Sequence, residues 1–246
     1  MKMVAKDNND GHLSVKFDKP IVPTVKAPIS NKELINRLAS LHDELSNIDD
    51  SSVDLSSYTA NLVNKKLLSH SSIGVQAYLC CCISDVLRIF APNAPYSAQQ
   101  LSDIFKLFFK QFARLTDKKD DPFYQQHVYL LKRLAEAKST ILITDLPDLE
   151  ALIVSIFNTF YTLALKGFPT ELELIITDIL SEVLSEAEVV PHEVLQLILQ
   201  KISNHDPSKL LLGNISSPEF NFSLAICEYN MDRMSRLVAQ YFSEIL

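Results

Sequence analysis

Residues 73–96, IGVQAYLCCCISDVLRIFAPNAPY, contain the two patterns that decide the fold. The stretch before APNAPY is apolar at almost every position, interrupted mainly by Gln76, Asp85 and Arg88. A helix that is hydrophobic on all faces packs against several neighbours. The two prolines then end it, because each lacks a backbone N–H donor and disfavours the α conformation in the residue before it. We therefore expect a core helix over about 72–90, followed by a rigid connector.

Amphipathic helices are expected on both sides of this core helix. Upstream, Ser30 and Glu33 form an S-x-x-E capping box ahead of apolar residues at three- and four-residue intervals. A second amphipathic segment runs from Leu55 to Leu68, and Ser97 with Gln100 forms another capping box after the connector.

Prolines punctuate the downstream half of the chain. A proline suits the first turn of a helix, where its missing N–H has no partner to lose. Each of five prolines precedes an apolar helical pattern: Pro122, Pro147, Pro169, Pro191 and Pro218. Gly167 is expected to end the helix that Pro147 opens. Residues 139–145, STILITD, are consistent with a frayed helical turn or a lone strand, and we favour the turn.

The helical segments recur at a nearly constant spacing. Alternate segments open at residues 72, 122, 169 and 218, at intervals of 50, 47 and 49 residues. HEAT and armadillo helix pairs repeat every 40–47 residues or so, and they bury a continuous core by stacking. We therefore predict an all-α solenoid, a right-handed stack of HEAT-like antiparallel helix pairs over residues 30–246, with an irregular helical bundle as the alternative. Because the chain stops on apolar helical residues, we expect this to be the N-terminal part of a longer solenoid.

Residues 1–29 lack the helical period and contain three prolines and scattered charge. They are expected to form an extended or disordered leader. Within it, residues 15–25 (VKFDKPIVPTV) are apolar enough to lie along a groove of the helical body, although a flexible tail is favoured.

Composition excludes several classes of protein. The chain has 246 residues, with 23 Lys and Arg against 30 Asp and Glu, for a formal net charge of −7. It has only four glycines, where an average composition would give about seventeen. This scarcity argues against an all-β fold and against phosphate-binding glycine loops. No apolar run reaches the ~20 residues of a membrane span, and the first residues are too polar for a signal peptide. A soluble, intracellular protein without a membrane role is expected.

No catalytic pattern stands out. The sequence lacks nucleotide-binding, zincin and nucleophile-elbow motifs, and none of its six histidines lies four residues from another. Adjacent Cys80, Cys81 and Cys82 cannot bridge one another, and with Cys227 they are expected to be buried thiols. His42-Asp43-Glu44 is interpreted as a solvated helix face. We therefore expect no enzymatic activity, no cofactor, no metal and no small-molecule substrate.

Two further features concern binding. A basic stripe of Lys132, Arg133 and Lys138 is a weak nucleic-acid candidate, since the chain lacks a basic balance. The connector Ala91–Tyr96 is rigid, and Tyr96 carries an amphipathic ring of the kind enriched in binding hot spots. From these features alone, a structural elbow between two helices is favoured over a partner site.

Residues 81–96, a cysteine pair followed by Asp85, Arg88 and A-P-x-A-P-Y, resemble the signature of the cohesin-associated "precocious dissociation of sisters" family. Further similarity continues through Leu101–Phe105 to Met234-Ser235-Arg236, and the leader VKFDKPIVPT is similar to that of fungal members. The resemblance covers nearly the whole chain.

The resemblance implies a HEAT-repeat scaffold, nuclear and chromatin-associated, that regulates maintenance and release of sister chromatid cohesion. The implied partners are the kleisin subunit of cohesin, with its main contact expected beyond residue 246, a Wapl-type releasing factor, the cohesin acetyltransferase and, indirectly, chromatin. The A-P-x-A-P-Y segment is associated with binding short motifs of such regulators, which carries over to Pro92, Asn93, Ala94, Pro95 and Tyr96. Asn93 stands where the family commonly has an acidic residue, so a charge-assisted bond to a partner arginine would be lost. The alternative is a generic HEAT or armadillo adaptor for another partner.

Overall fold

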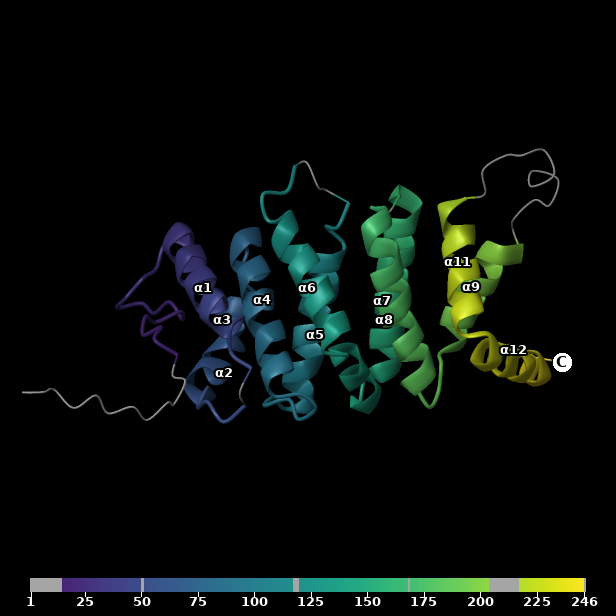
Figure 1. Ribbon diagram of the computed structural model, residues 1–246, viewed down its shortest axis with the longest axis horizontal. Coiled ribbons are helices and arrows are strands. Elements are labelled where there is room, and N and C mark those ends of the chain that lie inside the picture. The colour runs from purple at the N-terminus through teal and green to yellow at the C-terminus, as the bar shows by residue number, and fades with distance from the viewer. Residues whose placement is uncertain (1–14, 50, 117–119, 168, 204–216, 246) are drawn as a thin grey trace, which may run out of the picture.

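The computed structural model describes residues 15–49, 51–116, 120–167, 169–203 and 217–245. Every regular element in these ranges is a helix (Figure 1). In chain order they are α1 (Asn31–Leu45), α2 (Ser56–Leu62), α3 (Lys65–Leu68), α4 (Ile73–Ile89), α5 (Ala98–Phe112), α6 (Tyr124–Glu136), the 3₁₀ helix η1 (Ser139–Asp145), α7 (Leu149–Lys166), α8 (Thr170–Glu186), α9 (His192–Ser203), α11 (Pro218–Tyr229) and α12 (Met231–Ile245).

The helices stack in two rows along the long axis of the molecule (Figure 1). In the first row, α1, α4, α6, α8 and α11 each pack against the next; in the second row, α3, α5, α7 and α9 do so. The helix pairs α4/α5, α6/α7, α8/α9 and α11/α12 begin at residues 73, 124, 170 and 218, close to the predicted openings. The prediction of an all-α solenoid of helix pairs is confirmed, and the irregular bundle is excluded.

The helix ends follow the local sequence signals. Ser97 and Gln100 form the complete capping box that the sequence predicts for α5. At α1 only half of the predicted box forms: Ser30 accepts a hydrogen bond from the Glu33 N–H, but the Glu33 carboxylate pairs with Arg37 instead. Gly167 ends α7 with a φ of +87°, a left-handed conformation that glycine adopts without steric cost.

Two segments are divided more finely than the sequence pattern suggested. The amphipathic stretch 55–68 forms two short helices, α2 and α3, rather than one. The last apolar stretch breaks at Asn230, whose side chain donates to the Ile226 carbonyl and to Ser181 Oγ. Between α9 and α11, residues 204–216 lie outside the described ranges. Residues 139–145 form the helical turn that we favoured over a strand.

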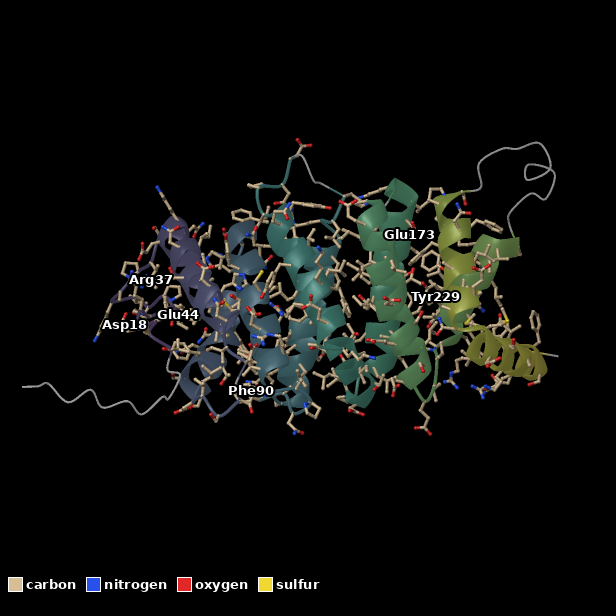
Figure 2. The ribbon with its side chains drawn as sticks, viewed as in Figure 1. Asp18, Arg37, Glu44, Phe90, Glu173 and Tyr229 are labelled. Atoms are coloured by element: carbon tan, nitrogen blue, oxygen red, sulfur yellow. The ribbon has the colours of Figure 1, made fainter. Side chains whose placement is uncertain are left out.

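The described part of the leader, residues 15–29, runs without helix along α1 and α2. Phe17 and Ile21 are buried in the core, and Glu44 Oε2 accepts from the Phe17 N–H at 3.1 Å. Arg37 Nη1 donates to the Pro20 carbonyl at 2.7 Å, so both α1 side chains face the leader (Figure 2). Residues 15–29 therefore lie along the helical body, which was the less favoured alternative, and do not form the flexible tail that we favoured. Residues 1–14 lie outside the described ranges.

The helix α7 is long and apolar enough to cross a membrane by length and composition alone. In the structure it packs against α5, α8, α9 and α11, and its buried residues include Phe157 and Phe160. Its apolar character is therefore accounted for by its place inside the stack.

Candidate functional site

The connector Ala91–Tyr96 turns the chain from the C-terminal end of α4 into the N-terminal end of α5, along one edge of the stack. Pro92, Asn93 and Pro95 are exposed at its tip, whereas Ala94 is half-buried against the core. The Asn93 N–H donates to the Phe90 carbonyl at 2.7 Å, which fixes the connector on the end of α4. Phe90 is labelled at the lower edge of the molecule in Figure 2. The tip is thus an exposed, preordered loop.

Tyr96 faces inward rather than toward solvent. Its ring packs against the hydrophobic core, and its hydroxyl is buried without a hydrogen-bond partner among the described residues. Burial raises the pKa of this hydroxyl above its ordinary value, so it stays protonated. Tyr96 therefore anchors the connector, in contrast to the exposed binding ring that the sequence suggested.

A groove of 180 Å³ lies directly beside the connector. It is formed by two consecutive helix pairs: the end of α4 with the connector, and the turn that follows α6. Its lining is almost entirely apolar, with one cation at the rim: Leu87, Ala91, Pro92, Ala94, Ala137, Lys138, Ser139, Ile141 and Leu142. Such a slot accepts one or two apolar side chains of an extended peptide.

Lys138 is the charged residue of this groove. Its φ of 51° places it in the left-handed region, which costs a residue other than glycine about 1–2 kcal/mol. The side chain is 67% exposed, and its Nζ lies 3.2 Å from Glu182 Oε1. A lysine therefore stands at a position after a helix end where glycine is usual.

Sequence reasoning did not identify the far wall of the groove, Lys138 to Leu142. It treated Lys138 as part of a basic stripe with Lys132 and Arg133, and the structure contradicts that stripe. Arg133 turns inward to Asp85, while Lys138 pairs with Glu182. The available signal was the run of β-branched residues after α6, which breaks the helical period.

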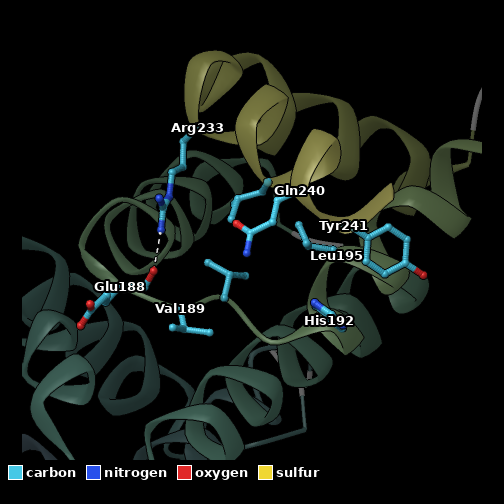
Figure 3. Close-up of a pocket in the computed structure, with 9 residues that line it drawn as sticks. Glu188, Val189, His192, Leu195, Arg233, Gln240 and Tyr241 are labelled. Carbon is cyan, nitrogen blue, oxygen red and sulfur yellow. Dashed lines mark hydrogen bonds between the residues drawn. The ribbon is translucent and has the colours of Figure 1, made fainter. Parts of the chain in front are cut away.

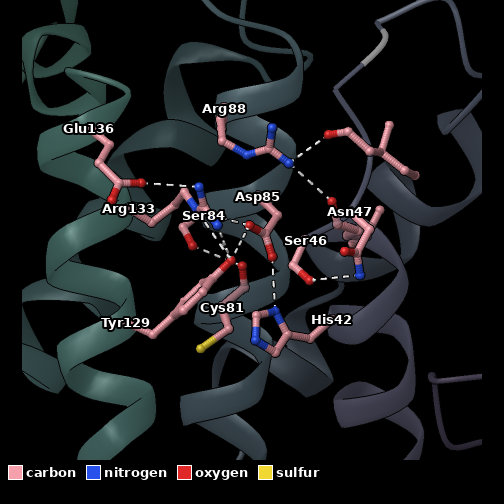
Figure 4. A network of polar contacts seen from close by, with 12 residues as sticks. His42, Ser46, Asn47, Cys81, Ser84, Asp85, Arg88, Tyr129, Arg133 and Glu136 are labelled. Carbon is pink, nitrogen blue, oxygen red and sulfur yellow. Dashed lines mark hydrogen bonds and ion pairs between the residues drawn. The ribbon is translucent and has the colours of Figure 1, made fainter.

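Behind the connector, Asp85 stands at the centre of a polar network that joins three helices (Figure 4). The carboxylate is fully buried on α4. Its Oδ2 lies 2.9 Å from Nδ1 of His42 on α1, and its Oδ1 accepts from the Tyr129 hydroxyl of α6 at 2.6 Å. Arg133 Nε lies 3.2 Å from the same Oδ1. Polar and cationic neighbours from α1 and α6 thus compensate a charge that water does not reach.

This network corrects the interpretation of His42-Asp43-Glu44 as a solvated face. Only Asp43 is exposed, since His42 contacts Asp85 and Glu44 binds the leader. Arg88, the next charged residue of α4, donates to the Leu45 and Ile48 carbonyls at 3.1 and 2.6 Å. The Asp and Arg of the sequence signature therefore position α1, α4 and α6, and the connector at the end of α4 is held by them.

The cysteines offer no reactive site. Cys80, Cys81 and Cys82 are buried, and burial raises the pKa of each thiol well above its ordinary value, which keeps the nucleophilic thiolate form rare. Cys227 is half-buried, and burial raises its pKa also. Within the described ranges, no group of three His, Cys, Asp or Glu side chains could hold a metal ion.

A second concavity lies between α9 and α12, but its volume is only 80 Å³ (Figure 3). Its charged group, Arg233, donates to the Ala187 carbonyl at 2.6 Å and so caps the end of α8. His192 lies 3.0 Å from Glu244. Because the polar groups are occupied within the protein, this concavity serves packing rather than ligand binding.

A stack of helix pairs with a rigid proline loop beside an apolar groove is typical of helical-repeat scaffolds, a class of proteins whose extended surfaces are used for binding. The family model described as "Sister chromatid cohesion protein PDS5 protein" matches residues 32–246. This chain belongs to the PDS5 family.

Individual relatives agree with this assignment. The chain is 41% identical to the sister chromatid cohesion protein PDS5 of Saccharomyces cerevisiae over 94% of this chain and 18% of that protein. It is 32% identical to its Schizosaccharomyces pombe counterpart over 95% of this chain and 20% of that one. A solved structure described as "Structure of the Pds5-Scc1 complex and implications for cohesin function" matches with a TM-score of 0.86 and 40% identity, over 94% of this chain and 36% of that chain. The chain thus spans about a fifth of the length of these curated relatives.

Proposed function

We propose that this chain is the N-terminal part of a non-enzymatic, nuclear and chromatin-associated scaffold that regulates cohesin in sister chromatid cohesion. Membership of the PDS5 family supports the role, and the solved structure that this chain matches is that of a Pds5-Scc1 complex. The partners proposed for the whole protein are the cohesin kleisin, with its main contact beyond residue 246, a Wapl-type releasing factor and the cohesin acetyltransferase.

The observation that carries a binding role for this part of the chain is the groove beside the proline connector. Pro92 and Ala94 form one wall, and Ile141 and Leu142 form the other. Because the connector is already ordered, a peptide that docks there loses its own freedom but costs the scaffold little. We propose that Pro92, Asn93, Ala94 and Pro95 contact a short motif of a Wapl-type factor or of the acetyltransferase, while Tyr96 supports them from behind.

Lys138 adds a charge preference to this proposed site. Its exposed ammonium at the rim of the groove favours a motif that places a carboxylate or a carbonyl beside the apolar anchor. Asn93 replaces the acidic residue that is common in the family and so contributes no charge to the opposite rim. A ligand for this chain should therefore depend less on a basic residue at that position than a ligand of acidic family members.

The experiment is a titration of a fluorescent Wapl-derived peptide against this chain. Ala94→Arg should weaken binding about tenfold or more, since the long, charged side chain occupies the apolar groove in place of the peptide's apolar anchor. Lys138→Gly removes the ammonium and should weaken binding about threefold. It should leave the melting temperature nearly unchanged, because relief of the left-handed strain offsets the greater freedom of glycine in the unfolded chain. Lys132→Ala, at an exposed position of α6 outside the groove, is the matched control.

Either of two results would overturn this site. Saturable binding that neither groove variant weakens would place the peptide elsewhere. No binding by folded wild-type protein would leave the connector a structural elbow. Tyr96→Ala is not used, because a buried ring that is removed lowers stability whatever its role.

The alternative, a generic helical-repeat adaptor, predicts a different client. A pull-down from an extract depleted of cohesin separates the two: an adaptor keeps its main client there, whereas a cohesin regulator loses it. Elemental analysis and a nucleotide-release assay on purified protein test the absence of enzymatic cofactors, because bound metal or nucleotide would contradict a pure scaffold.

A further inference from the structure

A groove larger than the one beside the connector lies where α3 and α5 of the second row meet the start of α4. It has a volume of 570 Å³, within the usual range for ligand sites, and it shares no residue with the groove beside the connector. The end of α3, the first turns of α4 and one side of α5 line it: Lys65, Leu68, Ser69, Gln76, Asp103, Lys106, Leu107 and Lys110.

Lysines dominate the rim of this groove. Lys106 Nζ is engaged by Asp148 Oδ2 at 2.8 Å. Lys65 and Lys110 are exposed, and no ion pair among the described residues uses either of them. Two uncompensated ammonium groups therefore face an open groove, with Asp103 as the one carboxylate in its lining.

The basic character of this groove is local to α3 and α5. These two helices contain four lysines against one acidic residue, whereas α7 and α9 each contain one lysine and one glutamate. The formal charge of −7 thus conceals a basic patch at this groove. An acidic segment is attracted to this patch.

The floor of the groove is polar and incompletely satisfied. Gln76 is only 5% exposed, and its Oε1 accepts from Gln111 Nε2 at the long distance of 3.5 Å. Gln76 Nε2 keeps some contact with solvent, and no hydrogen bond among the described residues uses it. A peptide carbonyl or carboxylate in the groove can therefore accept from this N–H.

We propose that the groove between α3 and α5 binds an acidic, extended segment of a partner protein. Side-chain carboxylates of that segment pair with Lys65 and Lys110, its backbone accepts from Gln76, and an apolar side chain rests on Leu68 and Leu107.

The observations favour a peptide over a nucleic acid. A nucleic-acid site needs a long basic track, with arginine or stacked aromatic side chains. This groove has no arginine and no aromatic residue, and it includes Asp103.

The proposal is tested by selection from a phage-displayed library of random 12-residue peptides on wild-type protein. The selected pool is then bound to Lys65→Glu/Lys110→Glu and to Lys132→Glu, which reverses an exposed charge of the first row as the matched control. The pool is also bound to the Ala94→Arg protein. Peptides that this variant fails to bind use the groove beside the connector and are discarded. The best selected peptide is synthesised with a fluorophore and titrated at low and high salt, alongside a single-stranded DNA 12-mer.

We expect a class of peptides enriched in Asp and Glu that binds wild type, Ala94→Arg and Lys132→Glu alike. The Lys65→Glu/Lys110→Glu protein should bind these peptides about tenfold or more weakly, and high salt should weaken the wild-type complex, because the contacts are exposed charge pairs. The proposal is overturned by a pool without acidic enrichment, by acidic peptides that the double variant retains, or by tighter binding of the DNA than of any selected peptide. A circular-dichroism melt of the double variant should match wild type, since both lysines are exposed.

Discussion

The N-terminal and C-terminal halves of the stack are held together by different forces. Around α1, α4 and α6, the buried carboxylate of Asp85 meets His42 from one side and Tyr129 with Arg133 from the other. Around α7 and α11, rings and a neutral hydrogen bond make the contact. The Tyr161 and Phe222 ring centroids are 5.1 Å apart, and the Tyr161 hydroxyl lies 2.7 Å from Ser223 Oγ.

This contrast determines which amino-acid substitutions each half tolerates. A buried charge is stable only while its partners remain, so the N-terminal half depends on the chemical identity of a few atoms. An apolar interface depends on volume and tolerates conservative exchange. The proline connector is attached to α4, and therefore to the half in which identity matters more. This explains how a site on a loop keeps a fixed geometry.

The largest effect expected from this comparison is that of Asp85→Ala. It removes the fully buried acceptor of His42, Tyr129 and Arg133 at once and leaves the half-buried Arg133 with only Glu136 as a carboxylate partner, which should lower the free energy of unfolding by about 3–5 kcal/mol. Urea unfolding followed by circular dichroism measures the loss.

The control is Asp49→Ala. Like Asp85→Ala, it removes a carboxylate that pairs with an arginine, in this case Arg88 of α4. Asp49 is 91% exposed, and Arg88 keeps the Leu45 and Ile48 carbonyls without it, so the loss should stay below about 0.5 kcal/mol. Equal losses for Asp85 and Asp49 would refute the claim that burial makes the N-terminal network critical.

The second prediction concerns a neutral, fully buried polar contact between α7 and α11 in the C-terminal half. Tyr161→Phe leaves the fully buried Ser223 hydroxyl without this partner and should cost about 1–2 kcal/mol. The double variant Tyr161→Phe/Ser223→Ala removes both polar groups together, and its loss should be clearly smaller than the sum of the single losses. Strict additivity in urea unfolding would show that the two hydroxyls act independently.

The helix pairs could be predicted from the sequence and the polar network could not, for a physical reason. The helix pairs and their spacing were predictable, because apolar periodicity and proline act within a few residues along the chain. The partners of Asp85 were not, since His42 lies 43 residues away and Tyr129 lies 44 residues away. Only the stacking of units brings them together, and His42 was for that reason assigned to solvent.

One part of the candidate site could likewise be predicted from the sequence, and the other part could not. The connector was found from its own prolines, but its opposite wall, Lys138 to Leu142, comes from the next repeat and carries no recognisable motif. The direction of Tyr96 was also beyond the sequence, because an aromatic ring at a loop end suits a core and a binding surface equally well.

The smallest expected effect is a pH dependence confined to the N-terminal half. The carboxylate of Asp121, just before α6, is 3% exposed and lies near Arg114 and His127. Burial alone would raise its pKa, but the Phe123 N–H, His127 and Arg114 outweigh burial, and the net pKa lies below the ordinary value.

A lowered folded-state pKa stabilises the protein above the ordinary pKa of an aspartate, near 4, and this contribution is lost as the pH falls through that value toward the folded-state pKa. Asp121→Asn keeps an acceptor for the Phe123 N–H but cannot titrate. The stability gap between wild type and Asp121→Asn should therefore be constant from about pH 5 upward and shrink below about pH 4. Urea midpoints measured across this range test it. A gap that widens in acid would mean that the folded-state pKa of this carboxyl is raised rather than lowered, so that burial outweighs the Phe123 N–H, His127 and Arg114.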